Sequence, residues 1–488
     1  MSTPAPDDRP GTPPKPAADE RWGAVVVGGG VAGLVAAREL ARAGVRTLVV
    51  EGRDAVGGAV RGHVVGGLRL DAGAESYATR GGAVAAYLED LGLADAIVAP
   101  GPLGSWVQLP GGAGPLPRTG LLGIPSSPWS ADTRRTLGWA GAARASLDLV
   151  LPRRVGARAG SLGALVRARM GERVLARLVR PVVGGVHAAD PDDLAVDAVS
   201  PGLPAALREH RSLARAVRQL RAAAPAGAAV QGLAGGMHVM VDALADDVLA
   251  HGGALRVRTR AVATRPGRLV AVELSDGTVV HAERLVVAAP ASADLLRPLL
   301  SADGDAQDEV LGFDDGADVR LVTLVLDAPE LDAAPRGTGV LVAREVEQVA
   351  AKALTHGTAK WPWLAAATPP GTHVVRLSYG RSDDEPADDS PAGPDARPEL
   401  VARALADARV LLGVPLRDEQ VLASAVVRWT QSLPRPSARH RDATAALRAA
   451  VAARPDGTRV AVCGAWVAGN GLASVIPDAV AAARTVLD

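Results

Sequence analysis

The sequence predicts an α/β fold in which one nucleotide-binding domain is interrupted by two insertions, and three features support this prediction. An apolar run at residues 24–27 precedes Gly28, Gly30 and Gly33, which have G-x-G-x-x-G spacing, and a helix-like stretch follows. A second strand-rich block begins near residue 229, and the last 30 residues repeat a strand, a glycine-rich turn and a helix. Units of this kind are typical of a Rossmann-like parallel sheet.

The other elements of this domain are expected from apolar runs between turn residues. The first helix continues through 34–43 and ends at Gly44, and the second strand, 45–50, is followed by Glu51. Further along, we expect a helix at 239–251, strands at 254–264, 269–274, 278–281, 285–289 and 459–464, and a final helix at 475–487.

The two insertions differ in character. One looks mostly helical, whereas the other alternates strands with helices, as an α+β substrate domain would. The expected division is a disordered tail at 1–21, a nucleotide-binding domain in three parts at 22–110, 228–297 and 456–488, a helical domain at 111–227 and a substrate domain at 298–455.

The composition indicates a folded globular protein. The chain has 53 basic and 53 acidic side chains and 48% hydrophobic residues, which argues against wholesale disorder and against a surface that binds nucleic acid generally. No stretch reaches about 18 uninterrupted apolar residues, so no transmembrane helix is expected. The proline-rich N-terminus lacks the apolar run of a signal peptide, and we expect a cytoplasmic protein. The single cysteine, Cys463, excludes an internal disulfide and is expected to be buried in a strand.

The glycine motif predicts that the chain binds a dinucleotide by its pyrophosphate. Gly28 allows a tight turn, Gly30 lets the backbone approach the phosphates, and Gly33 lets the helix pack on the strand. The free N–H groups at the start of the helix would bind the phosphates. Glu51 would accept hydrogen bonds from ribose hydroxyls, and its charge disfavours NADP.

The motif continues beyond Glu51 through residues 52–61, and this extension resembles the signature of flavin-containing amine oxidases and their relatives. In that superfamily the extension contacts FAD, whereas NAD-dependent dehydrogenases do not need it, so the resemblance favours FAD over NAD. Residues 71–76 resemble the segment that approaches the isoalloxazine side of the flavin. The cofactor-binding residues expected from these segments, beyond the three glycines, are Val31, Ala32, Glu51, Gly52, Arg53, Gly57, Gly58, Arg61, Gly73, Ala74 and Glu75.

Within that superfamily the chain is similar to the bacterial porphyrinogen oxidases of heme synthesis, from about residue 22 to its end. The similarity rests on the order and spacing of several segments, which are AGAESYATR (72–80), RLVRPVVGGVHAADPDDL (177–194), LAGGMHVMVDAL (233–244), GTGVLVARE (337–345), KWPW (360–363), RWTQSLPRP (428–436) and GAWVAGNGLASVIPDAV (464–480). Two positions depart from the family pattern. Members often carry Tyr where His187 stands, and Gly-Asp where Ala189-Asp190 stands.

The resemblance also implies roles for residues outside the glycine motifs. Lys360 matches a lysine that, in related flavin oxidases, holds a water at flavin N5 and assists the reaction with oxygen; a surface lysine is the alternative. Trp429 matches a tryptophan near the flavin, with a plain core residue as the alternative, and Val262 is a further cofactor-binding candidate. Arg61, beside the flavin, and His187, which could touch substrate or be an ordinary loop histidine, complete the candidates for catalysis.

The last helix has a physical rationale of its own. A turn containing Gly469 and Gly471 leads into this helix, whose N-terminus can point at the flavin pyrimidine ring. Reduced flavin is anionic around N1 and C2=O, and a helix dipole stabilises such a charge. Ser474, Val475 and Ile476 are therefore candidates for backbone contacts with FAD.

Together, these residues and the resemblance imply an FAD-dependent enzyme of heme biosynthesis. It would use dioxygen to oxidise coproporphyrinogen III to coproporphyrin III and release hydrogen peroxide. Protoporphyrinogen IX is the alternative substrate; an amine oxidase, a carotenoid desaturase and a non-catalytic FAD-binding scaffold are further alternatives. An amine oxidase should build an aromatic cage, which 12 aromatic residues can hardly supply. No metal-ligand spacing stands out.

A basic stretch lies in the helical insertion. Residues 134–180 contain 11 arginines and two acids, a local charge of +9 in a chain whose formal net charge is zero. Four interpretations stay open: a solvated helical face, capture of substrate propionates, peripheral contact with the inner face of an anionic membrane, and contact with the next heme enzyme, coproporphyrin ferrochelatase.

Overall fold

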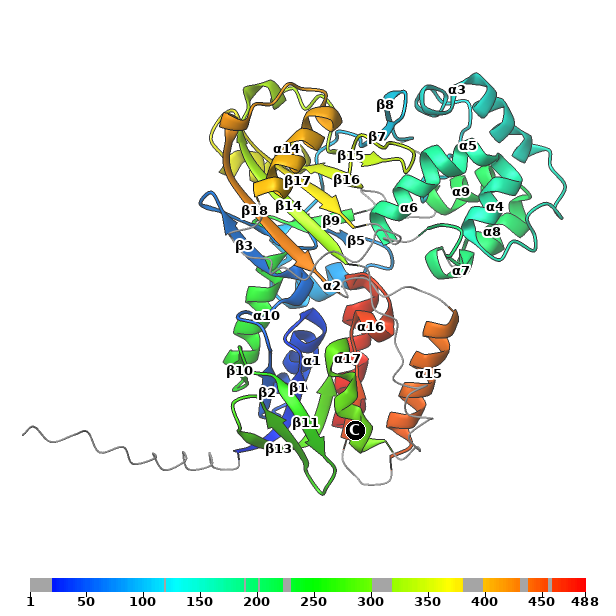
Figure 1. The fold of residues 1–488 in the computed structure, drawn as a ribbon. Helices are drawn as coiled ribbons and strands as arrows, with labels where there is room; N and C mark the ends of the chain where they lie inside the picture. Colours follow the sequence, from blue (N-terminus) through cyan, green and yellow to red (C-terminus); the bar gives the residue numbers. More distant parts are fainter. Residues whose placement is uncertain are drawn as a thin grey trace, which may run out of the picture.

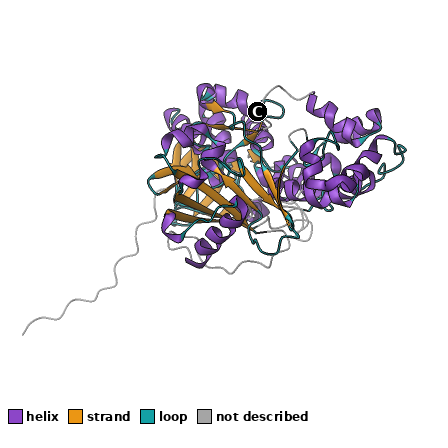
Figure 2. Ribbon diagram, turned by 90° about the horizontal axis from the view of Figure 1, so that it is seen from above, coloured by secondary structure: helices purple, strands orange, loops and turns teal. Residues whose placement is uncertain are grey.

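The computed structural model describes residues 20–117, 120–187, 190–200, 202–222, 230–300, 318–380, 398–430, 438–454 and 459–488. Figure 1 shows a lower body built around one sheet and, above it, a second sheet and a group of helices. The view from above in Figure 2 also sets most of these helices apart from the sheets. The chain therefore has the mixed α/β fold that the sequence predicts. In the described part of the chain, no helix is both long enough and apolar enough to cross a membrane.

The lower body contains a seven-stranded sheet whose strands come from three distant parts of the chain. Its order is β10-β2-β1-β13-β12-β11, and β19 pairs with the second half of β13. Strands β10, β2, β1, β13 and β19 are parallel, whereas β12 and β11 continue the sheet in antiparallel fashion. The strands are β1 (Glu20–Val27), β2 (Thr47–Val50), β10 (Ala254–Arg256), β11 (Ala261–Arg265), β12 (Val270–Leu274), β13 (Val279–Val287) and β19 (Arg459–Val462).

Strand β1 is buried on both faces, as its unbroken apolar run predicts. Ala24 and Val26 face one hydrophobic core, and Val25 and Val27 face another. The first core also contains Cys463, which is fully buried as expected, although the strand expected at 459–464 ends at Val462, one residue before it. Helices cover both cores, namely α1 (Val31–Arg42), α10 (His238–Ala250) and α17 (Leu472–Leu487) on the first, and η5 (Pro290–Leu299) and α15 (Ala438–Ala452) on the second.

Some elements differ from those expected. The strand expected at 254–264 is two strands, because amides in the intervening residues bond to the carbonyls of Glu51 and Arg53 instead of to the sheet. The strands expected at 278–281 and 285–289 form the single strand β13, which pairs with β12 at one end and with β19 at the other. The last helix, α17, begins at Leu472 rather than at residue 475.

Three parts of the expected domain division also need correction. Glu20 and Arg21, assigned to the tail, belong to β1 and pair with β13. The hairpin at 106–115 belongs to the second sheet rather than to the first body or the helices, because its first strand pairs with β15 (Gly339–Val342). Helix α15, assigned to the substrate domain, packs on the first sheet through Leu447 and Val451.

The upper sheet in Figure 1 has the order β18-β14-β17-β16-β15-β7-β8. Helix α14 (Pro398–Leu412) packs on one face, and the other face meets the β3–β4 hairpin, from the N-terminal part of the chain, through Val65 and Leu70. The hairpin therefore joins the two bodies where the candidate site lies. The strands concerned are β3 (Gly62–Val65), β4 (Leu68–Asp71), β7 (Trp106–Leu109), β8 (Gly112–Pro115), β14 (Val319–Asp327), β16 (Ala353–His356), β17 (Thr372–Tyr379) and β18 (Val421–Trp429).

A smaller sheet and three short helices complete the region between the bodies. The sheet has the order β5-β9-β6. These elements are β5 (Tyr77–Ala78), β6 (Ile97–Val98), β9 (Val230–Leu233), α2 (Ala83–Asp90), α12 (Gly357–Lys360) and α16 (Ala465–Ala468).

The helical insertion lies beside the upper sheet (Figure 1), and its helices share one apolar core that includes Leu137, Leu165 and Leu213. Its helices are α3 (Ala131–Ser146), α4 (Leu162–Met170), α5 (Glu172–Val174), the π-helical η4 (Leu175–Val179), α6 (Arg180–His187), α7 (Val196–Val199), α8 (Leu203–His210) and α9 (Leu213–Ala222).

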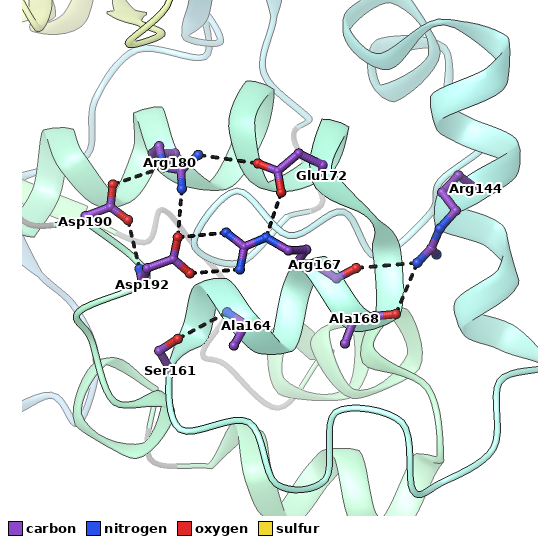
Figure 3. A network of polar contacts seen from close by, with 9 residues as sticks. All are labelled: Arg144, Ser161, Ala164, Arg167, Ala168, Glu172, Arg180, Asp190 and Asp192. Carbon is purple, nitrogen blue, oxygen red and sulfur yellow. Dashed lines mark hydrogen bonds and ion pairs between the residues drawn. The ribbon is translucent and has the colours of Figure 1, made fainter.

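Several arginines of the basic stretch are paired within the insertion. Figure 3 shows Arg167 between Glu172 and Asp192, with nitrogen–oxygen distances of 2.7 and 2.8 Å. Arg180 contacts Asp190 and Asp192 at 3.1 and 2.8 Å. Because both aspartates lie beyond residue 180, a charge count over 134–180 misses these partners.

Three more arginines of the stretch bond to groups of the same insertion. Arg144 donates hydrogen bonds to carbonyl oxygens at the C-terminal end of α4, as Figure 3 shows, and Arg177 donates to the carbonyl of Thr136. Arg169 pairs with the buried Asp148. Arg169 is 1% exposed, so the solvated-face interpretation does not hold for this residue, and for the rest of the stretch it stays a prediction.

Candidate active site

The three glycines after β1 serve different purposes. Gly28 has φ +104°, which favours glycine, and a Cβ on Gly33 would lie only 1.9 Å from the carbonyl oxygen of Gly28. A Cβ on Gly30 would meet no described atom of the chain within 4 Å. Val31 and Ala32 begin α1 and their side chains are buried, so they can offer only backbone amides. The space beside Gly30 lies at the N-terminus of α1, where backbone amides can bind a phosphate group.

A second pair of glycines lies against the first motif. The N–H of Gly57 donates to the carbonyl of Gly29 at 2.7 Å, and Gly57 forms a parallel bridge with Gly30. Gly57 and Gly58 have φ +107° and +55°, so both positions favour glycine. The extension that the sequence assigns to the cofactor therefore lies directly beside the open space at Gly30.

Glu51 closes the same region at the end of β2. Its Oε2 accepts a hydrogen bond from the N–H of Gly29, and its Oε1 accepts one from the N–H of Arg53, both at 2.8 Å. These two bonds fix the carboxylate and leave further lone pairs that can accept hydroxyl groups of a ribose.

Gly52 and Val262 lie at the edge of this region. A Cβ on Gly52 would lie 2.8 Å from Cγ of Arg260, so the two segments approach closely. Val262 is the extra residue of a β-bulge in β11 and is 52% exposed. A bulge redirects a side chain away from the regular sheet, and the contact of Val262 with the cofactor stays a prediction.

Segment 71–75 lies between the glycine extension and the upper sheet. The N–H of Ala74 donates to the carbonyl of Ala59 at 2.8 Å, and a Cβ on Gly73 would lie 2.1 Å from that oxygen. On the other side, Nε1 of Trp429 donates to the carbonyl of Ala72 at 2.8 Å. The structure thus brings together Gly73, Ala74 and Trp429, three of the residues predicted to bind the cofactor.

Two predicted arginines lie over the same tryptophan. The guanidinium carbons of Arg53 and Arg61 are 5.0 and 5.4 Å from the ring centre of Trp429. Arg61 also forms an ion pair with Asp54 at 3.2 Å. Trp429 is 5% exposed, so it is a packed residue that also organises the site.

Lys360 and Glu75 meet at the junction of the two bodies. The Nζ of Lys360 lies 2.5 Å from Oε1 of Glu75, and a nitrogen of Arg376 lies 2.9 Å from Oε2. Burial alone would raise the pKa of Glu75, but the two positive charges outweigh burial and lower that pKa to about 2. Glu75 is therefore a carboxylate shared by two cations rather than a free ligand, and Lys360 is not a surface lysine.

The start of α17 corrects the predicted helix contacts. The amides of Ser474 and Val475 already bond to the carbonyl of Gly471, and Ile476 lies a further residue into the helix. In a helix that begins at Leu472, the amides without an acceptor inside the helix are those of Leu472 and Ala473. The amides that can meet a ligand are therefore those of Leu472 and Ala473, which directly precede the predicted residues Ser474, Val475 and Ile476.

The side chain of one predicted residue, His187, cannot be placed, and one residue of the site, Arg376, was not predicted. His187 is the last residue of α6, and its side chain lies outside the described residues, so its role stays a prediction. Arg376 was missed by the sequence analysis, although a charged residue in the apolar strand β17 is a signal that could have found it. Within the described ranges, no three His, Cys, Asp or Glu side chains are grouped to hold a metal ion.

Known sequences resemble this chain over nearly its full length. The sequence model of the flavin containing amine oxidoreductase family matches residues 31–486. The coproporphyrinogen III oxidase of Propionibacterium freudenreichii is 32% identical over 95% of this chain and 90% of its own. The coproporphyrinogen III oxidase of Mycobacterium tuberculosis is 30% identical over 95% of this chain and 97% of its own.

Solved structures show the same fold. A putative protoporphyrinogen oxidase from Exiguobacterium sp. 255-15 superposes with a TM-score of 0.76 at 23% identity, covering 96% of this chain and 98% of its own. A reduced UDP-galactopyranose mutase gives a TM-score of 0.68 at 16% identity, with coverage of 96% and 95%. At these identities the likeness concerns the fold alone.

Proposed function

Because the chain belongs to the flavin containing amine oxidoreductase family, and relatives at least 30% identical over 95% of it are coproporphyrinogen III oxidases, we propose that it oxidises coproporphyrinogen III to coproporphyrin III with FAD, as a step of heme biosynthesis. The observation that carries the proposal is the open space at Gly30, bounded by Gly57 and the start of α1, in a chain of this family.

The residues fit FAD in three groups. The glycines and the first amides of α1 would hold the pyrophosphate, and Glu51 would hold the ribose beside Val262. Segment 71–75, with Trp429 and Arg61, would lie beside the flavin. When bound, FAD supplies a two-electron acceptor.

The reaction balances without an acid–base pair of unusual strength. Coproporphyrinogen III loses six electrons and six protons in three two-electron steps, and three dioxygen molecules take them up as three molecules of hydrogen peroxide. Each hydride leaves a methylene bridge between pyrroles whose N–H groups can release protons to solvent. The protein's task is therefore to orient the macrocycle, and we assign to Lys360 the assistance of the reaction with dioxygen.

The test is anaerobic mixing of the FAD-loaded protein with coproporphyrinogen III, followed by absorbance of the flavin. We expect bleaching, and admission of air should restore the yellow colour and produce porphyrin fluorescence and peroxide. Protoporphyrinogen IX in a parallel experiment should react more slowly. Faster reaction with protoporphyrinogen would change the assigned substrate, bleaching by amines alone would favour the amine oxidase, and no bleaching by any of them would favour the scaffold protein.

We further propose that α3 and the following turn make a peripheral contact with an anionic membrane surface. Trp139 and Val150 are 69% and 77% exposed, and the ring centres of Trp129 and Trp139 are 6.1 Å apart. Exposed arginines follow at 153, 154 and 158. Tryptophan beside arginine is the combination that suits a lipid interface, and α3 lies at the outer edge of the helices in Figure 1.

Sedimentation with vesicles tests this contact. The protein should bind vesicles rich in phosphatidylglycerol and not phosphatidylcholine vesicles, and W139A together with R153A should weaken the binding. If these vesicles do not bind the protein, and purified coproporphyrin ferrochelatase binds it through the same residues, the enzyme contact replaces the lipid contact.

A further inference from the structure

Three successive carbonyl groups of segment 71–75 are bound by side chains of the upper sheet. Nη1 of Arg376, on β17, donates to the carbonyls of Asp71 and Gly73 at 3.2 and 2.8 Å. Nε1 of Trp429, on β18, donates to the intervening carbonyl of Ala72. The segment therefore takes its position from the second body as well as from the first.

The carboxylate of Asp71, at the start of the same segment, is bound by the lower body. It accepts hydrogen bonds from the amides of Met237 and His238, and it contacts Nδ1 of His238, all at 3.0 Å. Both bodies therefore hold the backbone that leads to Glu75.

Glu75 lies between two cations on the side of the upper sheet. Lys360 and Arg376 contact different oxygens of its carboxylate, at 2.5 and 2.9 Å. The three side chains are 15–17% exposed. The group therefore carries a net charge of +1, largely shielded from solvent.

A contribution to stability does not by itself explain why Glu75, Lys360 and Arg376 are grouped here. Removing charged side chains from water is costly, and apolar residues of similar volume often give an equally stable protein. What a charged group adds is a fixed position for each charge, because the geometry of the hydrogen bonds restricts the side chains.

We propose that Glu75 and Arg376 are positioning residues: Arg376 fixes segment 71–75, and Glu75 holds the ammonium group of Lys360 in place. The inference rests on the proposed function, in which this segment and Lys360 lie beside the flavin. It gives the Glu75 carboxylate a role other than direct contact with the cofactor. Arg376 acts through the segment, and Glu75 acts through Lys360.

The charge of the group predicts the order of the FAD reduction potentials. E75Q leaves a net charge of +2, K360M leaves zero, and the double variant E75Q/K360M returns to +1. Because positive charge stabilises reduced FAD, the potential should be highest in E75Q, lowest in K360M, and close to wild type in the double variant. A chemical titration of the FAD-loaded proteins measures these potentials without a porphyrinogen.

Two further variants separate charge from position. R376K keeps the charge but loses the guanidinium fork, whose Nη1 bonds to the two carbonyls and whose Nη2 contacts Glu75. We therefore expect a changed visible circular dichroism spectrum of bound FAD with little change in potential. D242N removes a carboxylate from the exposed pair between Arg69 and Asp242, and it should change neither quantity.

Reoxidation of the reduced protein by dioxygen gives a second readout. It should slow about tenfold in both E75Q and K360M, because each variant loses the positioned ammonium group. Equal potentials and equal reoxidation rates in wild type, E75Q and K360M would overturn the role of Glu75, and an unchanged spectrum in R376K would overturn that of Arg376. If E75Q does not fold, the comparison of E75Q/K360M with K360M still tests the charge of Glu75, and R376K still tests Arg376. Failure to turn over coproporphyrinogen III with these shifts intact would count against the proposed substrate only.

Discussion

Asp148 and Arg169 form a fully buried ion pair at the centre of the helical insertion. Arg169 is 1% exposed and Asp148 is 0% exposed. The carboxylate of Asp148 also accepts hydrogen bonds from the hydroxyl of Ser212 and from the amides of Leu213 and Ala214, so it caps the start of α9. One carboxylate therefore joins α4, which carries Arg169, to α9.

Loss of that carboxylate should destabilise the insertion. D148N keeps the shape of the side chain but leaves the guanidinium of Arg169 buried without a counter-charge, and such changes typically cost about 3–5 kcal/mol. We expect faster hydrogen exchange of the amides in α4 and α9 and a lower melting temperature. D242N, in an exposed pair, should cost less than about 1 kcal/mol. Equal exchange in D148N and wild type would show that the pair does not hold the helices together.

Two glycines of the motif can be tested against each other: we expect Gly30 to leave room for the cofactor and Gly33 to be required for packing. Gly30 has φ −69° and ψ 176°, which alanine also adopts, and its Cβ would meet no described atom. G30A should therefore fold as the wild type does but bind FAD at least about tenfold more weakly, a loss of roughly 1.4 kcal/mol. Flavin fluorescence quenching measures the affinity.

The matching variant is G33A, because its Cβ would lie 1.9 Å from the carbonyl of Gly28. It should lower the stability of the apoprotein by about 1–3 kcal/mol or prevent folding. Tight FAD binding by G30A would mean that the open space is not the pyrophosphate site.

Arg61 is testable by its effect on the cofactor. Its guanidinium lies over Trp429 and pairs with the exposed Asp54, so it is not needed to neutralise a buried charge. R61A should fold normally, and we expect either weaker retention of FAD during gel filtration or a higher KM. R69A, which removes an exposed arginine from the neighbouring strand β4, is the control. Kinetics and FAD content equal to those of wild type would remove Arg61 from the site.

Much of the nucleotide-binding region was predictable because its signals are local. The glycines at 28, 30 and 33, the end of β2 at Glu51 and the extension at 57–58 lie within one short stretch, and backbone requirements fix each of them. The unbroken apolar runs also indicated strands buried on both faces.

The rest depends on pairing between distant residues. Arg376 and Gly73 are 303 positions apart, and the sequence around either residue does not indicate that the other is its partner. The start of α17 moved by one turn because apolar spacing does not mark the residue at which a helix begins. The charge of the basic stretch was overestimated because Asp190 and Asp192 fold back onto Arg180 and Arg167.

Buried histidines should make the protein less stable in acid. His356 is fully buried; its Nε2 contacts Nδ1 of His373, and Nε2 of His373 contacts Asp332. Burial, with a smaller effect from His373, lowers the pKa of His356 to about 4. Burial, with the nearby charges of Arg376 and Arg61, lowers the pKa of His63 to about 4 as well.

The direction of this pH effect on stability follows from comparing the protonation of the histidine in the folded and unfolded chains. An unfolded histidine, with a pKa of about 6.5, takes up a proton at a pH where folded His356 is still neutral. The stabilisation is therefore complete above about pH 6.5 and is lost as the pH falls toward 4. At pH 5, His356 alone should lower the free energy of unfolding by roughly 2 kcal/mol relative to pH 7.5. Urea unfolding at the two pH values measures this difference. H356F should reduce the pH-dependent difference even if it lowers stability at both values, and an unchanged difference would show that His356 does not set the acid limit.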